Sequence, residues 1–470
     1  MTALTIADAA RALRAGTLTA AGLLRQVSDQ ADKLDPQLGV YLTRFADDAA
    51  AAAERADREL AAGIDRGPLH GIPLGVKDIL ATRGWVTTAQ SLVHQPDWWR
   101  DRDAPVVARL RAAGAVITGK TTTMEYAIGL PDPDKPFPLP RNPWNPATWT
   151  GGSSSGTGAG VAAGLFLGGL GTDTGGSVRI PAAYCGITGL KPTYGLVPRA
   201  GCLPLGFSLD HIGPMAHSAL DCALMLSVMA GHDPRDPATR RGPAAAPGTR
   251  PDYAGALTGD LSGLRIGIER AIPGTAQWCD PALLPALDTV ADGLAAAGAD
   301  VTEVEIPCYR ALADADLVIM AGEAFSFHRA AMTERWADYG RYTRTFIAQG
   351  ALLSAADYVT AQRARRVACA ALGEVLGGLD AIVTPTCAAG APAYEGLDMG
   401  SLMTQIFTGA FNSTGLPALA LPAGFTAAGL PLSVQVIGHP LAEATVLAIG
   451  DALQRRTTHH LAEPEIATHG

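Results

Sequence analysis

Three short stretches of the chain carry side chains suited to acyl-transfer chemistry. Lys77 lies in the apolar run Ile72–Leu80, and loss of water around a lysine disfavours the ammonium ion and supplies a neutral amine base. Gly151–Gly158 is a Gly/Ser-rich turn. Ser177 follows two glycines, whose flexible backbone could aim N–H groups at an oxyanion. Each stretch also has an ordinary explanation on its own: a lysine that reaches solvent or pairs with Asp78, a flexible turn, and a helix-capping serine.

Two other motif matches lead to different chemistry. Gly114–Thr121 formally fits a phosphate-binding loop, but its variable residues form a β-branched run that predicts a strand. Gly152–Gly156 fits the Gly-x-Ser-x-Gly nucleophile elbow with Ser154 at its centre. An α/β-hydrolase-type esterase that uses Ser154, a later Asp and a histidine such as His439 is therefore an alternative.

Cysteine and histidine patterns give no sign of a metal or redox site. The nearest pair of the seven cysteines, Cys185 and Cys202, is 17 residues apart, which excludes a local Cys-x-x-Cys motif. The ten histidines form no convincing ligand cluster. We therefore expect no metal and no cofactor, reduced thiols and a cytoplasmic location.

The composition excludes several classes of protein. Of the 470 residues, 48% are hydrophobic and 17% are charged, which permits a large core and is too apolar for a disordered chain. The net charge of −9 argues against nucleic acid as a main partner, because phosphate-binding surfaces need clustered Lys and Arg. Two long uncharged stretches, 142–172 and 399–442, are interrupted by glycine or proline and predict no membrane span. We expect neither a nucleic-acid nor a membrane partner.

An α/β framework must position the candidate residues. Helical spacing predicts helices in the first 65 residues or so, and a short apolar strand pattern follows near Gly71. Leu264–Ile268, Pro281–Ala297 and Val301–Ile306 have the patterns of a strand, a helix and a strand, the unit of a parallel sheet. Pro131–Pro146 must be a loop because of its many prolines. The sequence predicts an α/β protein with a large sheet.

Taken together, these stretches resemble the amidase signature family. The block 151–181 matches its signature, with Gly-Gly-Ser-Ser followed by Gly-Thr-Asp-Thr-Gly-Gly-Ser-Val-Arg-Ile-Pro. Further matching motifs fall in the expected order at 72–78, 119–121, 141–145, 189–195, 209–215, 384–386 and 411–418. The resemblance implies an amidase-signature fold with a large central mixed β-sheet covered by helices on both faces. It also implies one domain over 1–470: N-terminal helices to about 65, a signature core of about 66–230, a linker of about 231–257, and the remaining sheet and helices in 258–470.

The resemblance assigns expected roles to individual residues. It implies a Ser-cisSer-Lys triad in which Ser177 is the nucleophile, Ser153 the middle serine with a cis peptide, and Lys77 the base. The expected oxyanion hole consists of Thr174, Gly175, Gly176 and the N–H of Ser177, and the expected supporting residues are Ser154, Asp173 and Arg179.

The sequence departs from the common family pattern in two places. Ala89–Ser91 reads Ala-Gln-Ser where members usually carry Ala-Gly-Ser, and Leu130–Pro140 is a proline-rich loop where many members are rich in Ser, Thr and Asn. This stiff loop either shapes the substrate pocket or merely crosses the surface. On the first view Leu130, Phe137 and Leu139 are candidate substrate contacts.

The predicted function is hydrolysis of a small-molecule amide or carbamate (urethane) through an acyl-enzyme, with a carbamate or ester side activity allowed. Within the same resemblance, the alternative is the glutaminase-type catalytic subunit of a tRNA-dependent amidotransferase. A catalytically dead scaffold is a further alternative, against which the intact triad argues. The sequence leaves the oligomeric state open, including a homodimer.

Overall fold

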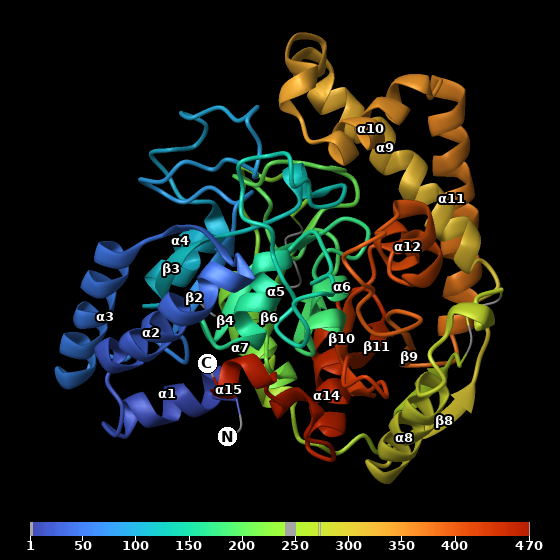
Figure 1. The fold of residues 1–470 in the computed structure, drawn as a ribbon. Coiled ribbons are helices and arrows are strands. Elements are labelled where there is room, and N and C mark those ends of the chain that lie inside the picture. Colours follow the sequence, from blue (N-terminus) through green and yellow to red (C-terminus); the bar gives the residue numbers. More distant parts are fainter. Residues whose placement is uncertain (1–2, 240–250, 271, 273, 470) are drawn as a thin grey trace.

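An 11-stranded mixed sheet runs through the computed structural model, which describes residues 3–239, 251–270, 272 and 274–469 (Figure 1). The strand order is β1-β3-β2-β4-β6-β5-β10-β11-β9-β7-β8. The strands are β1 (Tyr41–Arg44), β2 (Pro73–Lys77), β3 (Val116–Thr121), β4 (Gly168–Asp173), β5 (Thr188–Lys191), β6 (His211–Ala216), β7 (Arg265–Ile268), β8 (Asp300–Glu303), β9 (Ala381–Pro385), β10 (Ala418–Phe425) and β11 (Pro431–Gly438). β2 is parallel to β3 and β4, whereas β4 is antiparallel to β6. The predicted α/β class and mixed sheet are confirmed.

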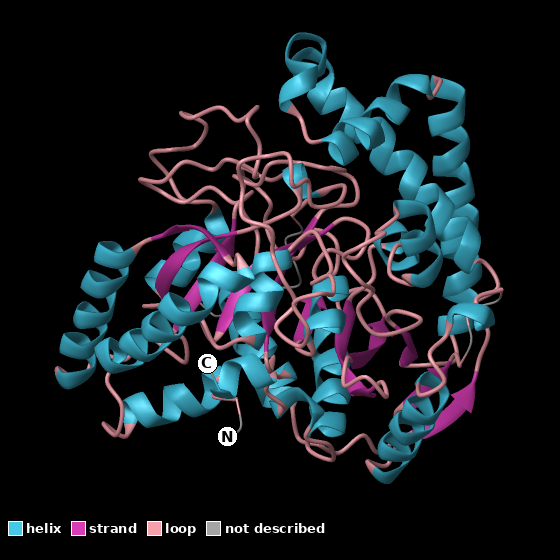
Figure 2. Cartoon of the chain, in the orientation of Figure 1, coloured by secondary structure: helices cyan, strands magenta, loops and turns pink. Residues whose placement is uncertain are grey.

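Helices cover both faces of this sheet (Figure 2). They are α1 (Ile6–Arg14), α2 (Ala20–Leu38), α3 (Ala46–Ala61), α4 (Pro105–Ala112), α5 (Ser155–Ala162), α6 (Arg179–Cys185), α7 (Ala219–Met229), α8 (Leu283–Ala296), α9 (Tyr309–Arg335), α10 (Arg341–Gln349), α11 (Ala355–Leu376), α12 (Met399–Gln405), α13 (Ala410–Thr414), α14 (Glu443–Gln454) and α15 (Glu465–His469). In β2, Leu74 and Val76 join the core cluster of α1, α3, α4 and α7. Gly75 between them faces Phe166, in the cluster of α5 and α6, as the two-residue period of a strand requires.

The long helices α9, α10 and α11 form an arm beside the sheet, at the upper right of Figure 1. Glu125 joins this arm to the core. Its carboxylate accepts hydrogen bonds from Gly340 N, just before α10, and from Ser91 Oγ, both at 2.6 Å. The arm is important because α9 and α10 supply part of the site described below.

Most of the predicted elements are present, with differences at their ends. Thr5 caps α1, because its hydroxyl accepts a hydrogen bond from Asp8 N at 3.0 Å. The run that formally matched a phosphate loop is β3, so the prediction of a strand is confirmed. The strand predicted over Val301–Ile306 begins one residue earlier and ends at Glu303. Part of the predicted linker, residues 240–250, lies outside the described residues.

Candidate active site

Lys77 lies at the end of β2 in the interior of the molecule. Its side chain is 0% exposed. Nζ donates hydrogen bonds to Ser153 Oγ and Thr172 Oγ1, each at 2.7 Å, and to Ser154 Oγ at 3.0 Å. Three hydroxyl oxygens therefore take the place of the water that the lysine has lost.

The ion pair that could have kept Lys77 charged forms elsewhere. Asp78, its neighbour in the chain, pairs with Lys120 Nζ at 3.1 Å, and both partners are buried. Burial lowers the pKa of Lys77 from 10.5 to about 7, although more distant acidic groups, Asp173 among them, act in the opposite direction. The amine can therefore lose its proton near neutral pH, as a general base must.

Ser153 and Ser154 stand at the entry to α5 and face different surroundings. The Gly152–Ser153 peptide is cis. Ser153 lines a cavity, whereas Ser154 is fully buried. The hydroxyl of Ser154 accepts a hydrogen bond from Thr172 N at 3.1 Å, and Ser154 N donates to Ser177 O at 3.2 Å. Ser154 thus holds the Gly/Ser turn against β4 and against the segment that carries Ser177.

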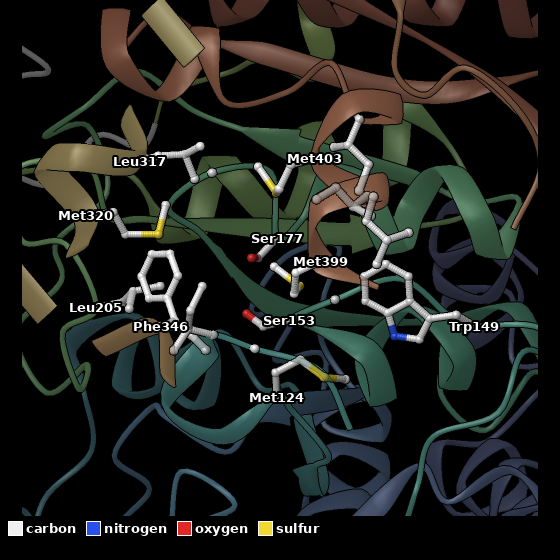
Figure 3. A pocket seen from close by; sticks show the side chains of 18 residues that line it. Met124, Trp149, Ser153, Ser177, Leu205, Leu317, Met320, Phe346, Met399 and Met403 are labelled. Atoms are coloured by element: carbon white, nitrogen blue, oxygen red, sulfur yellow. The ribbon is translucent and has the colours of Figure 1, made fainter. Parts of the chain in front are cut away.

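Ser177 lies in the turn between β4 and α6, and its side chain faces the same cavity as Ser153 (Figure 3). Among the described residues, Ser177 Oγ has no hydrogen-bond partner, which leaves it available to a ligand. Gly176 has a φ of +133°, and a Cβ on it would lie 1.9 Å from Thr408 Oγ1, so the turn requires glycine there. Within the described chain, the N–H groups of Gly175, Gly176 and Ser177 make no hydrogen bond and can serve an oxyanion.

Thr408 fixes the orientation of one of these N–H groups. Its hydroxyl donates a hydrogen bond to Gly175 O at 2.6 Å. The carbonyl and the following N–H of a trans peptide point in opposite directions, so this bond turns the Gly176 N–H away from Thr408. Thr408 is therefore a positioning residue for the turn.

Asp173 and Arg179 form a buried ion pair behind the turn. Arg179 Nε and Nη2 lie 3.0 Å and 3.1 Å from the two carboxylate oxygens, and Asn412 Nδ2 donates to Oδ1 at 2.7 Å. Burial by itself raises the pKa of Asp173, but the Arg179 guanidinium holds it well below its usual range. The charged pair joins β4, α6 and α13 around the turn.

A narrow cavity of about 70 Å³ opens over the two serines (Figure 3). Its side chains come from segments spread between residues 124 and 406, the signature block among them: Met124, Ala127, Ile128, Trp149, Ile180, Leu205, Leu317, Met320, Phe346, Met399, Leu402, Met403 and Ile406. Among the described lining residues none is charged, and the polar side-chain groups are the hydroxyls of Ser153 and Ser177 and the indole of Trp149. The site therefore combines two serine hydroxyls with an apolar wall.

The predicted substrate contacts do not line this cavity. Leu130 is 4% exposed and packs behind the wall in a cluster with Trp149 and Ile180. Leu139 lines separate depressions of the surface, and Phe137 is partly exposed. The view that these three side chains touch the substrate is not supported by their positions.

The proline-rich loop instead contacts the helical arm. Lys135 Nζ donates to the carbonyl oxygens of Ala337 and Asp338, at 2.9 Å and 3.0 Å. Asp132 Oδ2 accepts a hydrogen bond of 2.6 Å from Arg341 N, at the start of α10. The loop therefore supports the arm from outside, one layer away from the cavity.

Thr172, Thr408 and the apolar wall were not selected from the sequence. The one sequence signal for Thr172 was its place inside the signature block. In the structure it lies on β4, next to β2, the strand that carries Lys77. Thr408 and the wall residues come from segments whose approach to the serines depends on the tertiary fold.

The nucleophile-elbow hypothesis fits the geometry poorly. The hydroxyl of Ser154 is buried against Lys77 and Thr172, and His439 Nε2 contacts Leu379 O.

Within 3–239 and the other described ranges, no group of three or more His, Cys, Asp or Glu could hold a metal ion. In the same residues, no helix has the length and apolar character to cross a membrane.

Comparisons with known proteins agree on one family. The family model described as amidase matches residues 22–447. A relative from Chloroflexus aggregans, named as a glutamyl-tRNA(Gln) amidotransferase subunit, is 38% identical over 493 residues, which cover 99% of this chain and 98% of the relative. The native peptide amidase structure from Stenotrophomonas maltophilia has a TM-score of 0.84 and 31% identity, and covers 98% of both chains. A chain from a vestigial protein complex, described as revealing the evolutionary origins of an s-triazine catabolic enzyme, has a TM-score of 0.88 and 29% identity over 98% of this chain and 100% of that one.

Proposed function

Because the chain belongs to the amidase signature family and is thus a hydrolase of C–N bonds, we propose that Ser177, Ser153 and Lys77 form its catalytic triad. Neutral Lys77 takes a proton from Ser153, which takes one from Ser177 as the Ser177 oxygen attacks the substrate carbonyl carbon. The 2.7 Å contact between Lys77 and Ser153 supports the first transfer. The free N–H groups of Gly175, Gly176 and Ser177, beside Thr174, are placed to stabilise the oxyanion.

Collapse of the tetrahedral intermediate breaks the C–N bond. The proton held by Lys77 returns through Ser153 to the departing nitrogen, so that a neutral amine is released. The acyl group stays bound to Ser177. Water then attacks the ester carbonyl and gives a proton to the same relay. The bond between the acyl carbon and the Ser177 oxygen breaks, the relay returns the proton to that oxygen, and the acid is released. These steps need no metal or cofactor. We also propose a cytoplasmic location, in which thiols stay reduced.

The proposal about the substrate rests on the apolar character of the cavity. Glutamine would bring an α-ammonium and an α-carboxylate into the site, and burying an unpaired charge is costly. Among the described lining residues no charged side chain could pair with either group. We therefore propose a small-molecule amide or carbamate (urethane) with an apolar acyl or alkoxy group as the substrate.

The second candidate is a glutaminase component of a tRNA-dependent amidotransferase. The observation in its favour is the 38% identity over nearly the whole chain to a relative of that name, and by sequence this candidate is supported better than the first. It would bring partner subunits and tRNA into the function, which does not fit the expectation of a chain without a nucleic-acid partner.

A hydrolysis panel separates the two candidates. The purified chain is assayed for ammonia release from glutamine, acetamide and phenylacetamide, and for cleavage of ethyl phenylcarbamate. We expect kcat/KM for phenylacetamide to exceed that for glutamine by at least about a hundredfold, the effect of ~3 kcal/mol of unpaired charge. Preferred cleavage of glutamine would favour the amidotransferase candidate.

A covalent label tests the nucleophile in the same preparation. An aryl sulfonyl fluoride should modify Ser177, and Ser177→Ala should lose both labelling and turnover. Modification of Ser154 instead, or full activity of Ser177→Ala, would contradict the proposed triad.

A further inference from the structure

A second cavity of about 490 Å³ adjoins the one above the serines. The two cavities share three lining residues, Leu317, Met403 and Ile406, which form the partition between them. Its volume is far above the roughly 10–15 Å³ that one water molecule needs, so a ligand of several heavy atoms fits. The proposed catalytic steps do not use this space.

Two buried polar groups in this second cavity lack partners. Asp316 is 1% exposed and its Oδ1 makes no hydrogen bond, and the hydroxyl of Tyr309, a residue 8% exposed, makes none either within the described chain. Both residues line the cavity and lie on α9 seven positions apart, two turns along one helix face. Burial, with the nearby charge of Asp173, raises the pKa of Asp316 well above its usual range, and an ammonium group bound beside it would favour the charged carboxylate. Unpaired groups of this kind are costly unless a ligand satisfies them.

The surroundings of these groups define the chemistry of a ligand. Phe407 is buried and its ring meets that of Tyr309 edge to face at 6.3 Å, and the exposed Trp278 also lines the cavity. The one arginine among the described lining residues, Arg310, is paired with Asp314 at 3.0 Å near the surface. A carboxyl acceptor, a phenol and aromatic faces together suit an ammonium group on an apolar stem.

Asp316 also lies close to the catalytic turn. A Cβ on Gly175, which lines the first cavity, would lie 3.1 Å from Asp316 Oδ2, and a Cβ on Gly409, which lines the second, would lie 3.5 Å from the same atom. The carboxyl group therefore stands at the boundary between the two cavities. A substrate held at Ser177 can place its acyl part in one cavity and its amine part in the other.

We propose that the second cavity is the subsite for the leaving amine, and that it takes an amine whose apolar stem ends in a primary ammonium group, bound by Asp316 and Tyr309. The preferred substrates are then N-substituted amides with a cationic tail, not primary amides that release ammonia. This proposal rests on the proposed hydrolysis at Ser177.

Two substrates of matched length test the subsite. N-(4-aminobutyl)phenylacetamide carries the terminal ammonium, and N-pentylphenylacetamide has a methyl group in its place. The wild-type protein should prefer the first by about tenfold or more in kcat/KM, and Asp316→Asn should remove most of that preference because it removes a charge-assisted hydrogen bond. Tyr309→Phe should reduce it less. Glu334→Gln removes an acid from an exposed position of the same helix and should retain the preference.

A binding measurement separates failure of the subsite from failure of the proposed reaction. Calorimetry of N-(4-aminobutyl)phenylacetamide with Ser177→Ala should show binding that weakens about tenfold when Asp316→Asn is added. Equal affinity with and without Asp316→Asn, or an equal preference in the Asp316→Asn and Glu334→Gln proteins, would overturn the subsite. Continued turnover of this amide by Ser177→Ala would instead overturn the proposed reaction.

Discussion

Lys77 donates a 2.7 Å hydrogen bond to the hydroxyl of Ser153 in a place where, among the described residues, no carboxylate bonds to the lysine. The acid next to it in the chain, Asp78, is occupied by Lys120. A buried lysine among hydroxyl groups readily acts as a base, because its charged form lacks a counter-ion. We therefore expect the protonation of Lys77 to set the pH dependence of the reaction.

The first prediction concerns that pH dependence. Burial lowers the pKa of Lys77 from 10.5 to about 7, and the base must be unprotonated. Log kcat/KM for a neutral amide should therefore rise with pH below about 7, with a slope near one, and level off above it. Lys77→Met should lose most of the activity, and Lys77→Arg should not restore it, since guanidinium keeps its proton.

Lys191 supplies the matched control for this profile. It is also fully buried, and burial lowers its pKa to about 7 as well, but its Nζ donates to the carbonyl oxygens of Pro192 and Leu416 and not to a serine. Lys191→Met that stays folded should keep the inflection near pH 7. If the inflection is lost in Lys191→Met and remains in Lys77→Met, the base is Lys191 and the proposed role of Lys77 is wrong.

Thr408 gives the second prediction. Thr408→Val removes the hydroxyl that donates to Gly175 O and frees the peptide that carries the Gly176 N–H. We expect kcat to fall about tenfold to a hundredfold, less than the loss of an oxyanion donor itself, with a small change in KM. Thr408→Ser keeps the hydroxyl and should recover most of the rate. Parent-like kcat in a folded Thr408→Val protein would show that the turn needs no such support.

The sequence offered candidates for the reacting groups but not for the apolar wall around them. Lys77, Ser153 and Ser177 each stand in a short motif that has an ordinary explanation on its own, and only the joint resemblance of these motifs to one family selected them. The cavity wall could not be selected in this way, because Phe346 and Met403 are apolar residues on helices that would suit any core, and only the packing of α10 and α12 brings them over the serines. The fold class followed from strand and helix periodicity, whereas the eleven-strand order depends on pairing between distant segments.

Phe346 gives the third prediction, which tests the apolar wall. Phe346→Ala removes an aromatic side chain from the cavity and should lower kcat/KM for phenylacetamide by about tenfold or more, since burial of such a ring is worth roughly 1.5–3 kcal/mol. Acetamide, which is too small to reach the ring, should be affected much less. Phe327→Ala, at a site on α9 that is 49% exposed, is the control and should leave both rates unchanged. Equal losses for both amides would mean that the ring supports the fold and not the substrate.

The last prediction concerns the proline-rich loop, for which the sequence left two roles open and which in the structure contacts the arm. Asp132 accepts the hydrogen bond of Arg341 N at 2.6 Å, so a loop carboxylate caps the first turn of α10, the helix that carries Phe346. Loss of a helix cap costs about 1 kcal/mol, and fraying of this turn should also loosen the cavity wall. Asp132→Ala should therefore lower the free energy of unfolding in urea by about 1 kcal/mol and raise KM for phenylacetamide, with kcat nearly constant. Asp134→Ala, two residues along the same loop and exposed, should change neither quantity. If the two variants prove alike in urea and in KM, the loop is only a surface crossing, and the shape of the wall does not depend on it.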